Sequence, residues 1–284
     1  LRVELLKGST TNKQRKDILQ GLEDGSVHLL IGTHALITPD VLFNNLGYAI
    51  IDEQHRFGVE QRAELKNKSK QGVTETIPHI LVMTATPIPR TLSMCFYGDM
   101  DLSIIREMPK GRKPTETRVI RERGRASMYE FIRREIQKGR QAYFVYPLIE
   151  ESEKVDLKDA TLMHKNLCQV FFDYKVELLH GRMKTVDKNR IMLAYKKGEI
   201  QILVSTTVIE VGVDVSNATI MVVEHAERFG LSQLHQLRGR VGRGAEKSFC
   251  FLVASYAQSL ESHYRLKIME ETTDGFKIAE EDLK

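Results

Sequence analysis

The sequence has 284 residues, 42% of them hydrophobic and 28% charged, so it can form one large or two ordinary domains with buried cores. Its net charge of +4 favours a polyanionic partner only mildly. No apolar run approaches the roughly 18 residues that cross a membrane. Residues 1–8 lack the features of a signal peptide, and Cys95, Cys168 and Cys250 lack metal-ligand spacing. We expect a cytoplasmic protein with buried free thiols and no membrane contact.

Short apolar runs alternate with helical stretches along the chain. The first half has predicted helices over Lys13–Leu22 and Glu60–Lys68 and predicted strands over Val3–Leu6, His28–Ile31, Tyr48–Ile51 and His79–Met83. The second half has predicted helices over Tyr129–Lys138 and Val186–Lys197 and predicted strands over Ala142–Tyr146, Val176–Leu179, Ile200–Val204, Thr219–Val223 and Phe249–Val253. This alternation indicates βαβ units and a parallel sheet, the α/β class.

The segment Met108–Pro114 contains two prolines, a glycine and three cations, which suit neither a helix nor a strand. We therefore predict a linker over 109–116 between a first lobe at 1–108 and a second at 117–257. The remaining 258–284 should begin a C-terminal helical segment. The acidic run Glu150–Asp159 is predicted to be a surface loop.

An internal repeat supports two related lobes. Leu5-Leu6-Lys7-Gly8 matches Leu178-Leu179-His180-Gly181 at an offset of 173 (181 − 8). The same offset, without a gap, places Gly25 on Gly198 and Thr33 on Thr206. A chance match between two βα units is the alternative; duplication of a whole lobe is the interpretation that we favour.

Two adjacent carboxylates follow the predicted strand Tyr48–Ile51. In open α/β sheets ligands bind beyond the carboxyl ends of the strands. Asp52 there could hold Mg²⁺, and Glu53 could orient or deprotonate an attacking water. A solvated acidic turn is the alternative explanation.

The next predicted strand ends in Thr84-Ala85-Thr86-Pro87, two hydroxyls around a small residue. Alone this pattern is also typical of a turn or a helix cap. Its place one strand after Asp52 and Glu53 makes it informative.

In the second half, a strand again ends in hydroxyls, at Ser205 and Thr206, and Gly212 and Asp214 follow. Further on comes Gln236-Leu237-Arg238-Gly239-Arg240-Val241-Gly242-Arg243. Arg240 and Arg243 are three residues apart, so a helix would place them on one face. Such a pair suits arginine fingers at a γ-phosphate; a general basic patch for polyphosphate is the alternative.

These four segments resemble motifs II, III, V and VI of superfamily 2 helicases, in order and spacing, over nearly the whole chain. The resemblance implies two RecA-like parallel-sheet lobes of the P-loop NTPase type. The continuations Arg56-Phe57-Gly58-Val59, Ile88-Pro89-Arg90 and Glu227-Arg228-Phe229-Gly230 narrow it to the RecG and Mfd types. Gln54-His55 and the tail Asp274–Leu283 are similar to the RecG type.

The resemblance implies an ATP- and Mg²⁺-dependent DNA helicase or translocase in bacterial recombination and repair, a cytoplasmic monomer acting on branched or forked DNA. Its catalytic residues would be Asp52, Glu53, Gln54, His55, Arg240 and Arg243, with Asp52 and Glu53 at the metal. Nucleotide contacts would come from Asp52, Gly212, Asp214, Gln236, Arg240 and Arg243, and coupling from Thr84 and Thr86. DNA contacts would come from Gly32, Thr33 and His34, which resemble motif Ib, and from Arg182, Ser205 and Thr206; for His34 a packing role is the alternative, and for Arg182 a role without DNA contact.

The sequence contains no GxxxxGKS or GxxxxGKT phosphate loop. We expect the loop to precede Leu1, so that the first lobe here is incomplete and the chain is a fragment. Two alternatives stay open: an Mfd-type double-stranded DNA translocase, and a non-catalytic DNA-binding module that has lost the loop.

Overall fold

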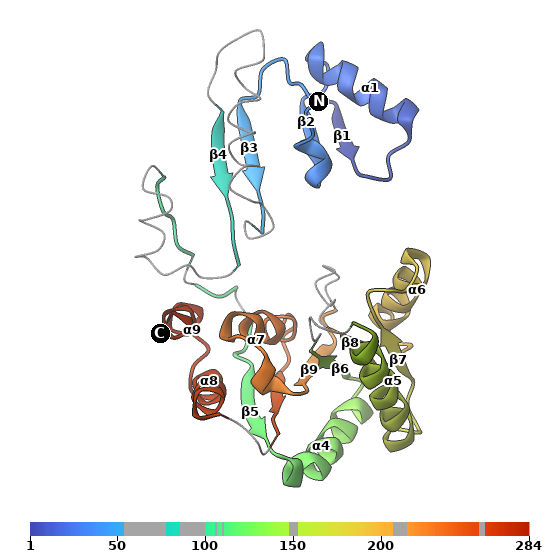
Figure 1. Ribbon diagram of the computed structural model, residues 1–284, viewed down its shortest axis with the longest axis vertical. Helices are drawn as coiled ribbons and strands as arrows, with labels where there is room; N and C mark the ends of the chain where they lie inside the picture. The colour runs from blue at the N-terminus through green and yellow to red at the C-terminus, as the bar shows by residue number, and fades with distance from the viewer. Residues whose placement is uncertain are drawn as a thin grey trace. The chain divides into compact units, whose positions relative to one another are not determined.

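The structure is a computed structural model that describes residues 1–53, 78–85, 100–105, 107–109, 111–147, 153–206, 215–255 and 259–283 (Figure 1). The chain divides into two compact units, Leu1–Ala85 and Thr86–Lys284. Among the described helices, none has the length and apolar character needed to span a bilayer. The predicted helix Glu60–Lys68 lies outside the described residues.

The second unit is built on a six-stranded parallel sheet in the order β5-β10-β9-β6-β8-β7. Every residue of the four inner strands is buried, which explains why these strands are mostly apolar in sequence. The strands are β5 (Glu116–Ile120), β6 (Gln141–Tyr146), β7 (Val176–Leu179), β8 (Ile202–Thr206), β9 (Ala218–Val223) and β10 (Phe249–Val253).

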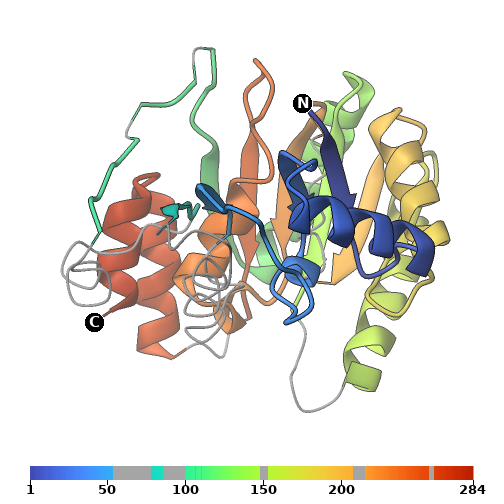
Figure 2. The same ribbon diagram turned by 90° about the horizontal axis from the view of Figure 1, so that it is seen from above.

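Helices cover both faces of this sheet. One face packs against α4 (Arg125–Gln137) and α5 (Glu153–Val170), through residues such as Ile132 and Leu167. The other face packs against α6 (Thr185–Lys196), α7 (Leu231–Arg238), α8 (Leu260–Glu271) and α9 (Gly275–Asp282). Figures 1 and 2 show α7, α8 and α9 as neighbours. Short 3₁₀ turns, η4 (Glu122–Gly124) and η5 (Ala226–Arg228), precede α4 and α7.

The C-terminal helices hold α7 at both ends. At its start, the carboxylate of Asp282 accepts hydrogen bonds from the backbone N–H groups of Leu231 (3.2 Å) and Ser232 (3.3 Å). At its end, the Arg238 guanidinium donates to the carbonyl oxygens of Met269 (2.9 Å) and Thr272 (2.8 Å). The position of α7 is therefore set by residues far away in the sequence.

A carboxylate also occupies the outer edge of the sheet. Strand β5 is an edge strand, and the backbone N–H of Val119 donates to Oε1 of Glu270 on α8 at 3.0 Å. A side chain thus satisfies an edge donor that a further strand would otherwise pair.

The first unit contains β1 (Val3–Leu6), α1 (Asn12–Glu23), β2 (Leu29–Gly32) and the 3₁₀ turn η1 (His34–Leu36). Strands β1 and β2 are parallel, and a small core that includes Leu6, Ile18 and Leu22 lies under them. A second parallel pair joins β3 (Tyr48–Ile51) to β4 (His79–Val82).

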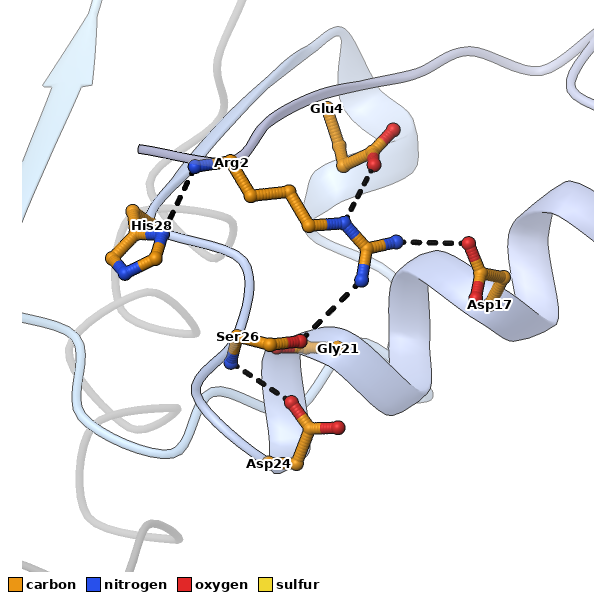
Figure 3. A network of polar contacts seen from close by, with 7 residues as sticks. All are labelled: Arg2, Glu4, Asp17, Gly21, Asp24, Ser26 and His28. Carbon is orange, nitrogen blue, oxygen red and sulfur yellow. Dashed lines mark hydrogen bonds and ion pairs between the residues drawn. The ribbon is translucent and has the colours of Figure 1, made fainter.

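Arg2 fastens the start of β1 to α1 and to the turn after it (Figure 3). Its guanidinium contacts Glu4 Oε1 (2.8 Å), Asp17 Oδ2 (2.8 Å) and Ser26 Oγ (3.4 Å), and its backbone N–H donates to His28 Nδ1 (3.0 Å). One side chain therefore joins three parts of the unit.

The two segments of the internal repeat have the same local structure, and duplication of a whole lobe stays a prediction. The βαβ unit β1–α1–β2 and the unit β7–α6–β8 begin with the same tetrapeptide, Val-Glu-Leu-Leu, and their helices have equal length. The pairing register is also the same: Val3 lies opposite Leu29, and Val176 opposite Ile202. Gly25 and Gly198 both adopt left-handed backbone, with φ of 76° and 79°.

The two copies differ in how far their apolar residues are exposed to solvent. Val3 is 53% exposed and Leu29 51%, whereas the equivalent Val176 is 8% exposed and Ile202 is fully buried. The β1–β2 pair therefore presents an apolar face to solvent. In the second unit the corresponding face of β7 and β8 is buried.

Three sequence-based expectations need correction. Strand β5 was not predicted, and it begins at Glu116, inside the predicted linker. The loop predicted over Glu150–Asp159 is wrong from Glu153 on, because α5 begins there; Glu, Lys and Leu favour a helix despite the acidic composition. Cys250 is buried as expected but Cys168 is only half-buried, and Cys95 lies outside the described residues.

Candidate nucleotide and DNA site

Asp52 and Glu53 directly follow β3, at the carboxyl end where the sequence predicted them. Asp52 is exposed, and its Oδ1 accepts the backbone N–H of Glu53 at 2.8 Å. Glu53 has φ of 54°, a left-handed conformation that is uncommon outside glycine and that clusters at functional sites. The turn presents two carboxylates at a strand end. Carboxylate oxygens are ligands that Mg²⁺ binds together with substrate phosphates.

Thr84 lies at the same sheet edge. Strands β3 and β4 are parallel neighbours, Ile51 is opposite Val82, and the N–H of Met83 donates to Ile51 O at 2.7 Å. Thr84, two residues beyond Val82, is exposed beside the carboxylate turn. Gln54, His55 and Thr86 lie outside the described residues.

Gly32 ends β2 in close contact with β1. A Cβ atom at Gly32 would lie 2.3 Å from Leu6 O, so the strand pair itself requires glycine there. Thr33 is exposed, and its carbonyl accepts the N–H of Leu36 at 3.0 Å as η1 forms from His34 onward. A role in DNA binding for these three residues stays a prediction.

The corresponding edge of the second sheet carries Ser205, Thr206 and Arg182. Ser205 is fully buried and its Oγ donates to Thr206 O at 2.6 Å; Thr206 is 2% exposed and its Oγ1 has no hydrogen-bond partner among the described residues. Arg182 is exposed. Partial burial of His180, together with the charges of Lys188 and Arg182, lowers the pKa of that imidazole. Of the three, only Arg182 presents its side chain to solvent; Gly212 and Asp214 lie outside the described residues.

Helix α7 carries Gln236, which is half-buried, and ends at Arg238. The next residues, Gly239–Gly244, form a turn that we call the arginine turn because it carries Arg240 and Arg243. Gly242 has φ of 75°, so the chain leaves the helical conformation between the two arginines. The expectation that one face of a helix presents both arginines is therefore wrong. Both side chains still reach solvent, since Arg240 is half-buried and Arg243 is exposed.

The arginine turn lies at the amino-terminal edge of the second sheet, opposite Ser205 and Thr206. Cβ atoms at Gly242 and Gly244 would lie 2.9 Å from Thr115 Oγ1 and Ser216 O, respectively, both close before strand starts. Just past the turn, Glu246 pairs with Arg140, before β6, at 2.7 Å. The structure thus separates the predicted nucleotide arginines from the predicted DNA residues of this lobe.

Arg238 has a different role from the arginines that follow it. It is 4% exposed, donates to backbone carbonyls of the C-terminal helices, and contacts His235 Nδ1 at 3.0 Å. Burial next to this guanidinium lowers the pKa of His235 from 6.5 to about 4. Three arginines in six residues therefore divide into one anchor and two surface groups, which spacing alone could not reveal.

A buried ion pair at the carboxyl end of β9 was not anticipated. Glu224 is 1% exposed and accepts from Arg125 Nη1 (2.6 Å) and Nη2 (3.1 Å); the same Nη1 donates to Tyr129 Oη (3.1 Å). Burial and the Glu224 charge raise the pKa of Tyr146, which lies nearby, far above its usual range. A lone glutamate after an apolar strand gave the only sequence signal for this cluster.

Two sequence families match the chain. The DEAD/DEAH box helicase family matches residues 1–95, and the helicase conserved C-terminal domain matches residues 124–245. Together they agree with an α/β protein containing RecA-like helicase lobes, as the sequence predicted. The predicted linker 109–116 falls between the two matches and remains a prediction.

The chain is also similar, over its whole length, to individual proteins. It is 53% identical to the ATP-dependent DNA helicase RecG of Synechocystis sp. and 52% identical to that of Thermotoga maritima, over 34% and 36% of those proteins. A solved structure of RecG bound to a three-way DNA junction matches with a TM-score of 0.76 and 48% identity, over 100% of this chain and 36% of that one. The chain spans about a third of the length of these relatives.

Proposed function

The chain belongs to the RecG-type superfamily 2 helicases, and on that premise we propose that the protein at its full natural length is an ATP-dependent DNA helicase that remodels branched DNA. Such an activity serves recombination and repair of forks and junctions. We further propose that it needs Mg²⁺ and acts as a monomer in the bacterial cytoplasm. The Mfd-type translocase and the non-catalytic module are not favoured.

The observation that carries the proposal is the edge of β3 and β4, where Asp52, Glu53 and Thr84 come together on two parallel strands. Asp52 would hold Mg²⁺, which would neutralise charge on the phosphates. Glu53 would orient a water and take its proton, and Gln54 and His55 would continue this motif. Thr84 and Thr86 would couple the nucleotide state to DNA movement.

The second lobe would supply the remaining nucleotide contacts. Arg240 and Arg243 would stabilise charge on the γ-phosphate, and Gln236, Gly212 and Asp214 would complete the nucleotide contacts. The phosphate loop that binds most of the triphosphate in such motors has no counterpart within residues 1–284.

DNA would be held mainly through its backbone, since hydroxyls, amides and cations at strand ends position a strand without reading its bases. Gly32, Thr33 and His34 would serve in the first lobe, and Arg182, Ser205 and Thr206 in the second. The burial of Ser205 and Thr206 favours contact through the backbone of their strand end over direct contact through their hydroxyls.

The test is ATP hydrolysis by the full-length protein with three-way junctions, linear duplex or no DNA. We expect Mg²⁺-dependent hydrolysis that a junction stimulates more than a duplex of equal length. Hydrolysis stimulated equally by duplex would favour the Mfd-type alternative, and DNA binding without hydrolysis would favour the non-catalytic module.

A further inference from the structure

The residues just before β5 touch both glycines that frame the first half of the arginine turn. These residues, Pro109 and Gly111–Thr115, belong to the predicted linker, and we call them the connecting segment. Arg112 and Gly239 are 127 residues apart in the sequence, yet the fold brings the connecting segment and the arginine turn together at the amino-terminal edge of the sheet. Nothing in the proposed chemistry of Arg240 and Arg243 accounts for this contact.

Arg112 makes the first of these contacts. Its Nη2 donates to the carbonyl oxygen of Gly239 at 3.5 Å, at the position where α7 ends. The backbone fixes where Arg112 lies: its N–H donates to Pro109 O at 3.2 Å, and Gly111 has φ of 85°, a left-handed conformation that glycine adopts readily. A half-buried guanidinium held by a tight turn therefore meets a helix-terminal carbonyl, a group that cations stabilise.

Thr115 makes the second contact. A Cβ atom at Gly242 would lie 2.9 Å from Thr115 Oγ1 and 3.5 Å from Ser248 Cβ, so the turn passes directly against both side chains. The next residue, Glu116, donates its N–H to Ser248 O at 2.9 Å and starts the β5–β10 ladder. The connecting segment is thus fixed to the sheet on one side and to the arginine turn on the other.

We propose that Arg112, with Thr115, is a positioning residue that holds the arginine turn in the geometry needed for ATP hydrolysis. This inference rests on the proposed function and adds to it that Arg112 and Thr115, in the predicted linker, support the catalytic arginines. Arg112 touches no reacting group; it acts through the placement of Arg240. A displacement of a catalytic group by about 1 Å can cost up to about a hundredfold in rate, so even a modest contact at this turn is significant.

The matched test compares Arg112→Ala with Lys113→Ala in the full-length protein. Both remove one cation from the connecting segment, but Lys113 is exposed and makes no contact with the turn among those that the structure describes. We expect Arg112→Ala to lower the DNA-stimulated kcat by roughly tenfold to a hundredfold, with KM for ATP and the affinity for junction DNA within about twofold. Lys113→Ala should behave as wild type.

A double-mutant cycle then separates positioning from a general loss of structure. If Arg112 acts through Arg240, Arg112→Ala combined with Arg240→Ala should be no slower than Arg240→Ala alone. Multiplying effects would overturn the proposal, as would an unchanged kcat for Arg112→Ala. If Arg112→Ala lowers the Tm, the Arg112→Lys variant, which keeps a hydrogen-bond donor, serves as the second test and should recover most of the kcat. An Arg112→Lys variant that has the wild-type Tm but the low kcat of Arg112→Ala would also contradict the proposal.

Hydrogen exchange tests the same contact without any catalysis. The N–H of Arg240 donates to Leu237 O and that of Val241 to Arg238 O, at 3.0 and 3.3 Å. We expect Arg112→Ala, but not Lys113→Ala, to speed exchange at these two amides by about tenfold or more. Equal exchange in both variants would remove the positioning role. If the wild-type protein shows no DNA-stimulated hydrolysis, the proposed function fails, while this measurement still decides the contact.

Discussion

Arg125, at the start of α4, and Glu224, at the end of β9, form a two-point ion pair in a site where Glu224 is 1% exposed. The same guanidinium also meets Glu122, whose side chain is 64% exposed, at 3.1 Å. One arginine thus has a buried and a solvated carboxylate partner. The buried partner joins a helix to a strand, and the solvated one belongs to the adjacent 3₁₀ turn.

This arrangement allows a matched prediction about stability. Glu224→Gln should lower the free energy of unfolding of the second unit by up to about 3 kcal/mol, because the half-buried Arg125 guanidinium loses its buried counterion and keeps only the solvated Glu122. Glu122→Gln, the same substitution at the same arginine, should change it by less than about 0.5 kcal/mol. Urea denaturation followed by circular dichroism measures both, and equal effects would show that burial does not distinguish the two pairs.

Glu53→Gln in the full-length protein keeps the shape of the side chain but removes the proposed base. We expect ATP binding to persist and turnover to fall by on the order of a hundredfold or more. Glu23→Gln, at the exposed end of α1, serves as the control. Near-normal hydrolysis by a pure Glu53→Gln preparation would withdraw Glu53 from catalysis.

Arg243→Ala should lower ATP hydrolysis by roughly a thousandfold, as the loss of an arginine finger does, while nucleotide-free DNA binding changes far less. Arg238→Ala, only five residues away, should instead lower the Tm, because Arg238 is buried and bonds the backbone of the C-terminal helices. If Arg243→Ala weakens DNA binding and leaves ATP hydrolysis unchanged, the arginine turn binds the phosphate backbone of DNA instead.

The backbone conformation around Arg240 and Arg243 could not be predicted from the sequence. Spacing identified Arg240 and Arg243 but could not foresee that Gly242 takes a left-handed conformation between them. Nor could it separate Arg238 from its neighbours, since its partners on α8 are main-chain carbonyls that leave no mark in the sequence. By contrast, the unit β7–α6–β8 was predictable, because repeated apolar positions and a repeated glycine fix both its period and its turn.

Strand β5 was missed for a related reason. Glu116, Arg118 and Thr117 give it a polar composition, because an edge strand needs fewer apolar side chains than an inner strand such as β9. The site at Asp52 and Glu53 was predictable because parallel strands bring their carboxyl ends to one edge, a property of the topology that needs no side-chain detail.

His235 makes the second unit sensitive to acid. Burial and Arg238 lower its pKa in the folded protein from 6.5 to about 4, so the unfolded chain takes up a proton first as the pH falls. Stability from the neutral imidazole is complete above pH 6.5 and is lost on acidification towards pH 4, by at most about 3 kcal/mol. Thermal denaturation between pH 7 and pH 4 measures this loss, and His235→Gln should flatten this part of the Tm profile.

Residues 1–284 by themselves should show no measurable DNA-stimulated ATP hydrolysis, because no phosphate loop lies within them. The exposed apolar face of β1 and β2 should also make the first unit the less protected one, with protease cleavage before Pro109 faster than after it. Limited proteolysis with mass spectrometry locates the cuts. Robust turnover by this chain would mean that a phosphate site of another kind exists within it.

The hydrogen bond between Val119 and Glu270 limits how the second sheet can grow. A strand from another molecule could extend the sheet at β5 only by displacing a carboxylate that already occupies the exposed amide. Displacement would bring a peptide carbonyl against a negatively charged side chain, an unfavourable exchange near neutral pH. Glu270 is therefore a guard against polymerisation of the protein through this edge of the sheet.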